Sequence, residues 1–201
     1  MSCYKFDQIK NAVLSKGYKW FEDGEYNLNI VGVRNSSTGT RVTNRFDDCI
    51  TVSFKTERHG QQFLCYPATT DPGKHWMANL LNPRGAAILV PGQYSGSHAI
   101  GLHQGKYRAL RQVKPLPVYR DSNKDMNYDL TRSKIHVGLF GINIHRAAKS
   151  GISQLVDKWS GGCQVIASAN DFSYFMGIVN ASADIYGNSF TYTLIESKDI
   201  I

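Results

Sequence analysis

Residues 142–166 read INIHRAAKSGISQLVDKWSGGCQVI, and this stretch decides what we expect of the fold and of the site. One apolar segment ends in His145, and a second begins after Cys163, eighteen positions later. Cys163 follows two glycines, which let the backbone approach a ligand closely and expose its amides. Two apolar segments that carry an imidazole and a thiol are typical of a cysteine nucleophile with a histidine base.

The segments around this stretch predict a mostly β, α+β domain with a helix near each end. Apolar residues at helical spacing predict helices over 6–14 and 169–183. Apolar runs bounded by turn residues predict strands over 26–34, 46–55, 62–68, 86–90, 106–113, 133–145 (one strand or a pair) and 189–196. The prolines at 115 and 117 predict an extended link, and the glycine-punctuated stretch 97–107 predicts a loop lining a cleft.

The whole chain sets limits on the class of protein. Its 201 residues favour a single domain, 1–201, with a full apolar core. Four cysteines without CxxC spacing predict neither a disulfide framework nor a zinc site. The net charge of +7 favours an anionic partner, but the basic residues are scattered, which argues against nucleic acid. No apolar run reaches the ~18 residues that span a bilayer, and the oligomeric state is left open.

The order of residues from His145 to Cys163 resembles the signature of the L,D-transpeptidase family. In that family a histidine precedes a Ser/Thr-His-Gly-Cys turn by a similar gap, and Ser160 and Gly162 match the first and third positions of this turn. The resemblance implies that Cys163 is the nucleophile and His145 the general base, oriented by the backbone carbonyl of Arg146. It covers the last third of the chain.

The chain departs from the family pattern at Gly161, where the family has its second histidine. We expect the amides around Gly162 to hold an oxyanion. Lys158 and Arg146 are cations that could lower the pKa of Cys163 or hold a substrate carboxylate, or they are solvated loop charges. The residues expected to contact substrate are Ser160, Gly161, His103, Tyr107 and Lys158.

The resemblance implies a β-sandwich with short peripheral helices. It also implies a cysteine-dependent enzyme that cleaves or exchanges stem-peptide amide bonds of bacterial peptidoglycan through a Cys acyl-enzyme, with no required cofactor. The N-terminus, MSCYKFD, has no basic-then-apolar signal region. We therefore expect a phage-encoded peptidoglycan hydrolase (endolysin), present in the host cytoplasm or a virion and delivered to the cell wall.

Two other functions are considered. Gly161 favours a non-catalytic virion or cell-wall-binding structural protein on the same fold. A papain-like peptidase is disfavoured, because in that class the cysteine precedes the histidine in sequence.

Oxygen-bearing side chains alternate through the loop DSNKDMNYD, residues 121–129. Their spacing resembles the first nine positions of an EF-hand calcium loop. Met126 replaces the glycine of position six, and Arg132 replaces the bidentate glutamate of position twelve. The alternatives are a structural Ca²⁺ site and a solvated acidic turn. The candidate ligands are Asp121, Asn123, Asp125, Asn127 and Asp129.

Overall fold

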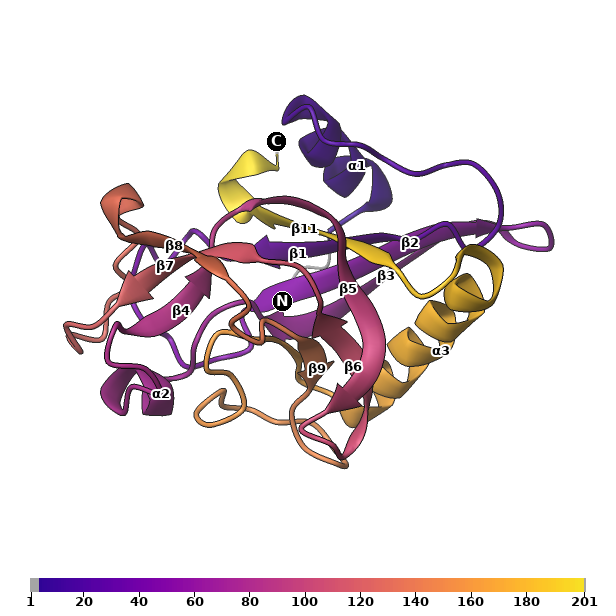
Figure 1. The fold of residues 1–201 in the computed structure, drawn as a ribbon. Coiled ribbons are helices and arrows are strands. Elements are labelled where there is room, and N and C mark those ends of the chain that lie inside the picture. The colour runs from indigo at the N-terminus through magenta and orange to yellow at the C-terminus, as the bar shows by residue number, and fades with distance from the viewer. Residues whose placement is uncertain (1–3, 201) are drawn as a thin grey trace.

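The computed structural model describes residues 4–200, and a closed eight-stranded β-barrel forms its centre (Figure 1). The prediction of a mostly β domain with a few short helices is confirmed, but the strands close into a barrel where a sandwich was expected. Around the barrel the order is β1 (Asn29–Arg34), β11 (Phe190–Glu196), β5 (Gly92–His103), β6 (Tyr107–Gln112), β9 (Ile144–Arg146), β10 (Gln164–Ile166), β3 (Gly60–Thr69) and β2 (Asp48–Thr56).

A smaller antiparallel sheet and three α-helices surround the barrel. The sheet has the order β4 (Ala86–Leu89), β7 (Leu116–Asp121) and β8 (Ile135–Gly138). The helices are α1 (Phe6–Ser15), α2 (Lys74–Ala78) and α3 (Ala169–Tyr186), and two short 3₁₀ turns are η1 (Arg132–Lys134) and η2 (Ser197–Asp199). In Figure 1 the small sheet lies at the left and α3 at the right.

Strand β1 is buried on both faces because its side chains alternate between two apolar clusters. Ile30 packs into the main core with the inward residues of the other barrel strands. Val31 and Val33 face the other way and pack against Ile9 and Val13 of α1. The predicted N-terminal helix is therefore confirmed, and it covers the outside of the barrel.

Helix α3 contributes its apolar face to the main core. Ser168 caps its N-terminus, accepting a hydrogen bond from the Asp171 amide at 3.2 Å. The helix predicted over 169–183 is confirmed, and its residues Phe172, Phe175 and Val179 are buried against the barrel residues. The helix follows β10 after only two residues, so its packing also fixes the end of the strand that follows Cys163.

Strands β9 and β10 are parallel neighbours, and this pairing positions the candidate site. Their register places Gln164 opposite Ile144 and Val165 opposite His145. Gln164 is fully buried, where its side-chain amide donates to the Thr70 carbonyl at 3.3 Å and its Oε1 accepts from the Tyr192 hydroxyl at 2.7 Å. The residue next to Cys163 is therefore anchored to two other strand segments.

One local prediction is wrong, and two others are made more precise by the structure. The predicted loop over 97–107 is mostly strand, because β5 runs to His103 and its hairpin partner β6 begins at Tyr107. The predicted strand over 133–145 is divided between two sheets, as β8 and β9. The link at the two prolines continues into β7, whose Pro117 lies in the strand. Strands β7 and β8 are set by pairing between segments far apart in sequence, whereas β5 and β6 pair with each other across a short turn.

Buried His98 links β5 to Ile142, which lies just before β9. Its Nδ1 accepts from the Ser97 hydroxyl and its Nε2 donates to the Ile142 carbonyl, each at 2.8 Å. Burial lowers the pKa of His98 to about 4, so the ring is neutral and structural.

The helices of residues 4–200 include none with the length and apolar character needed to cross a membrane.

We predict that Tyr192→Phe lowers the free energy of unfolding by about 1–3 kcal/mol, because it removes the donor to a buried Gln164 oxygen. Urea denaturation measures the loss. The control is Tyr186→Phe, which removes a hydroxyl from a side chain that is 46% exposed and should change stability by less than about 0.5 kcal/mol. Equal effects of the two substitutions would contradict the anchoring role of Tyr192.

Candidate functional site

Cys163 and His145 line the same cavity, which has a volume of about 260 Å³. His145 lies within β9, and Cys163 lies one residue before β10, the parallel neighbour of β9. Apolar walls come from side chains that include Trp76, Phe140 and Trp159. The structure thus brings together the two residues that the sequence predicts as base and nucleophile.

The His145 ring is held in one orientation. Its Nδ1 donates to the Arg146 carbonyl at 2.7 Å, and the Tyr107 hydroxyl donates to the same oxygen at 3.3 Å. The His103 ring stacks on it, with centroids 4.1 Å apart and planes 21° apart. Because Nδ1 carries the proton, Nε2 has the free lone pair, and among residues 4–200 it makes no hydrogen bond.

Burial lowers the pKa of His145 to about 3, and the charges of His103 and Arg146 act in the same direction. The hydrogen bond to the Arg146 carbonyl opposes these effects only in part. The imidazole is therefore neutral at physiological pH, which is the state a general base needs.

The Cys163 thiol is protonated at rest. Its Sγ donates to the Gly141 carbonyl at 3.0 Å, and burial raises the pKa of the thiol to about 11, against a smaller opposing effect of the Asn143 backbone amide. Lys158 and Arg146, which could have lowered the pKa of this thiol, do not contribute to its shift. Sequence reasoning missed Gly141 and Asn143, because they contact Cys163 through their backbone and leave no side-chain signal.

The turn before Cys163 is shaped by Ser160. The Ser160 hydroxyl donates to the Cys163 carbonyl at 2.8 Å and accepts from the Gly162 amide at 3.1 Å, and the residue is fully buried. We expected Ser160 to contact substrate, but the structure places it inside the turn. The Gly162 amide, expected to be free for an oxyanion, is already hydrogen-bonded.

Both glycines of the turn are explained by their surroundings. Gly162 has φ +127°, and a Cβ there would lie 2.2 Å from the Ala87 carbonyl oxygen. Gly161 lines the cavity, and a Cβ there would meet the flexible end of Leu81 at 2.9 Å and the Trp76 ring at 3.6 Å. Trp76 and Leu81 thus occupy the space beside the position where the L,D-transpeptidase pattern has a histidine.

A larger hollow of about 750 Å³ continues from His145, and we call it the cationic lobe. The residues that it shares with the cavity of Cys163 are His103, Gln104, His145, Lys158 and Trp159. Its lining has no carboxylate and four cations, which are Lys106, Arg146, Lys149 and Lys158.

The predicted substrate contacts His103, Tyr107 and Lys158 all lie in this lobe. Arg146 is held over the Tyr107 ring at 4.2 Å and donates to the Ala148 carbonyl at 2.6 Å. Within residues 4–200, none of the four cations forms a salt bridge. The lobe is therefore suited to an anionic ligand.

The acidic loop uses its oxygens to bind backbone amides. Asp121 accepts from the amides of Asn123 and Asp129, at 3.3 and 2.7 Å, and Asp125 accepts from the amide of Asn127 at 2.8 Å. The described part of the chain has no group of three or more His, Cys, Asp or Glu side chains that could hold a metal ion. Calcium binding by this loop stays a prediction.

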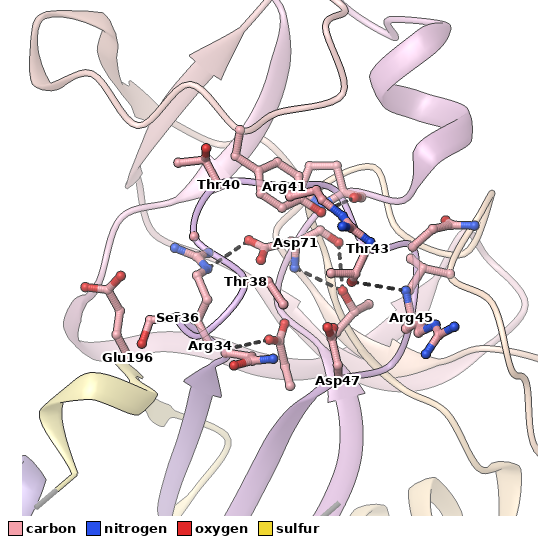
Figure 2. Close-up of a pocket in the computed structure, with 18 of the residues that line it drawn as sticks. Arg34, Ser36, Thr38, Thr40, Arg41, Thr43, Arg45, Asp47, Asp71 and Glu196 are labelled. Carbon is pink, nitrogen blue, oxygen red and sulfur yellow. Dashed lines mark hydrogen bonds and ion pairs between the residues drawn. The ribbon is translucent and has the colours of Figure 1, made fainter.

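A separate polar cavity of about 210 Å³ is shown in Figure 2, where Arg34 and Asp71 point toward each other. Arg34 Nε lies 2.8 Å from Asp71 Oδ1, and the other two guanidinium nitrogens donate to the Leu89 and Thr70 carbonyls. Burial, with the charge of Asp71, raises the pKa of the neighbouring Asp48 to about 7. The buried pair of Arg34 and Asp71 joins the end of β1 to the segment after β3.

We predict that Gly162→Ala destabilises the protein by about 2–3 kcal/mol, because the backbone conformation and the Ala87 carbonyl both oppose a Cβ. Gly161→Ala, the matched control, should cost under about 1 kcal/mol, because the Leu81 side chain can move. Urea denaturation of the two variants tests this, and a Gly162→Ala variant as stable as Gly161→Ala would refute it.

We predict that alkylation of Cys163 by iodoacetamide accelerates continuously from pH 6 to pH 10. The thiolate is the reactive species, and the raised pKa of about 11 keeps its fraction rising across this range. Mass spectrometry of the Cys163 peptide gives the rate, and Cys163→Ala confirms the assignment. A plateau near pH 7 would instead reveal a resting thiolate–imidazolium pair.

Comparisons with known proteins give no relative. No protein-family model matches the chain, no curated protein matches its sequence, and no solved structure matches its fold.

Proposed function

We propose that this protein is a cysteine-dependent acyl-transfer enzyme that opens amide bonds in the stem peptides of bacterial peptidoglycan. One observation carries the proposal: Cys163 and His145 line one cavity from adjacent parallel strands, with the imidazole oriented by the Arg146 carbonyl. The L,D-transpeptidase-like motif of residues 145–163 supplies the substrate class.

In the proposed reaction, Cys163 Sγ attacks the amide carbonyl carbon while His145 Nε2 takes the thiol proton. The tetrahedral oxyanion collapses, the C–N bond breaks, and His145 returns the proton to the leaving amine. Water or another amine then attacks the thioester with His145 as base, which frees Cys163 and gives hydrolysis or exchange.

The oxyanion needs a donor other than Gly162, whose amide is bound to Ser160. Over residues 4–200, the backbone amide of Cys163 has no acceptor of its own. We therefore assign the Cys163 amide as the oxyanion donor, because it lies on the attacking residue itself.

The resting site holds a neutral thiol and a neutral imidazole, since burial raises the pKa of Cys163 and lowers the pKa of His145. The thiol proton is held by the Gly141 carbonyl. Proton transfer to His145 is then coupled to attack on a bound substrate, which limits side reactions of the free enzyme.

Two features support peptidoglycan as the substrate. The stem peptides of peptidoglycan carry carboxylates, and the cationic lobe beside His145 has four cations and no carboxylate. The net charge of +7 favours approach to an anionic wall.

The test is digestion of purified sacculi by the wild-type protein and by Cys163→Ala, with chromatographic analysis of the muropeptides. We expect new or exchanged stem-peptide products with the wild type alone. Identical profiles for the two proteins, both folded by circular dichroism, would overturn the proposal.

A second candidate is a non-catalytic virion or wall-binding protein on the same fold. The occupied Gly162 amide and the protonated thiol favour it. It predicts that both proteins sediment with sacculi and that neither changes the muropeptides.

A further inference from the structure

A third cavity, of about 280 Å³, adjoins the cavity of Cys163, and we call it the Arg120 pocket. The two share Trp76, Leu81, Phe140 and Gly161, whereas the Arg120 pocket and the cationic lobe share no lining residue. Cys163 therefore lies between two different hollows, one lined by cations and one lined mostly by apolar groups.

Arg120 of β7 is the buried charge of this pocket and is only 7% exposed. Its Nη1 donates to the Gly85 carbonyl at 2.9 Å, and its guanidinium lies 4.4 Å from the Phe140 ring centroid. Its Nε is buried without a hydrogen-bond partner, and no described carboxylate forms a salt bridge with it. Burial and the charge of Arg84 both lower the pKa of Arg120, and no acidic group raises it.

Arg34 is the comparison for Arg120, because it is a buried arginine that joins structural elements of the same protein. Arg34 is 4% exposed and has both an Asp71 counter-ion and two carbonyl acceptors. A buried cation without a counter-ion costs on the order of several kcal/mol. The difference between the two arginines indicates that the partner of Arg120 is a ligand.

The Arg120 guanidinium is held in place before any ligand arrives. Gly85 has φ +110°, and a Cβ there would lie 2.3 Å from the Asp121 carbonyl oxygen, so the Gly85 backbone lies tight against β7. Its carbonyl and the Phe140 ring fix Arg120 on two sides. A fixed guanidinium loses little entropy when it forms paired hydrogen bonds with a planar carboxylate.

We propose that the Arg120 pocket binds a carboxylate attached to a short apolar body, with Arg120 as the carboxylate-binding residue. The apolar body packs against Trp76, Leu81 and Phe140. The assignment of this carboxylate to the acyl part of a substrate of Cys163 rests on the proposed function, whereas binding itself does not.

The experiment uses full-length Cys163→Ala protein, so that binding is measured without turnover. The probes are 4-methylpentanoate and its uncharged analogue 4-methylpentanamide, with inorganic phosphate as a second anion. Binding is followed by NMR through the indole N–H signal of Trp76, which donates to the Lys158 carbonyl at 3.0 Å. Trp20, packed beside α1, is the internal reference.

We expect the carboxylate to bind at least tenfold more tightly than the amide and than phosphate, and to shift the Trp76 signal while the Trp20 signal stays in place. Arg120→Met should reduce carboxylate affinity to that of the amide. Arg108→Met, which removes an exposed arginine of β6, should leave it unchanged.

Equal affinity for acid and amide, tighter binding of phosphate, or unchanged binding by Arg120→Met would overturn the proposal. If Arg120→Met does not fold, the affinities of the Cys163→Ala protein for 4-methylpentanoate and 4-methylpentanamide still test the proposal. The binding experiment involves no turnover. Carboxylate binding at Arg120 can therefore be found even if sacculi are not cleaved, and sacculi can be cleaved even if no carboxylate binds at Arg120.

Discussion

The parallel pairing of β9 and β10 is part of the closed barrel, and it brings His145 and Cys163 to the same cavity. Parallel strands cannot be joined by a tight turn, so the chain from Ala147 to Cys163 must cross over before it pairs. Buried Gln164 fixes the end of that crossover, because its side-chain amide is bound to Thr70 and Tyr192. The position of the thiol thus depends on strands far away in the sequence.

This geometry creates a site whose reactive groups are both neutral. The same burial that raises the pKa of the Cys163 thiol lowers the pKa of the His145 imidazole. An ion pair would need more solvent or an additional charge near it. The Arg146 carbonyl fixes the tautomer of His145, so that Nε2 carries the free lone pair.

The two hollows on either side of Cys163 differ in how they hold positive charge. The cationic lobe has several cations with exposed or half-buried side chains, whose attraction for an anion is weakened by solvent and salt. The Arg120 pocket has one buried cation, whose charge is little screened and whose geometry is fixed. The first arrangement suits the recruitment of an anionic polymer, and the second suits the recognition of one group.

The sequence by itself determined most of the local elements and pointed to the two residues of the candidate site that line one cavity. Helical spacing predicted α3, apolar runs bounded by turn residues predicted β2 and β3, and the motif from His145 to Cys163 pointed to one shared site. These features depend on residues close together in the chain, or on a single motif. The burial of Ser160 and the hydrogen bond from the Gly162 amide to its hydroxyl were missed. The partners of a hydroxyl and an amide depend on the path of the turn in three dimensions.

Only the tertiary structure decided that the sheet closes into a barrel and that residues 133–145 are divided between two sheets. It alone revealed Arg120 as a buried cation with no counter-ion among residues 4–200. A single arginine in a strand looks the same in sequence whether or not an acid lies across from it. Strand pairing and charge pairing are set by contacts between distant segments, and no local pattern of residues encodes which distant groups will face each other.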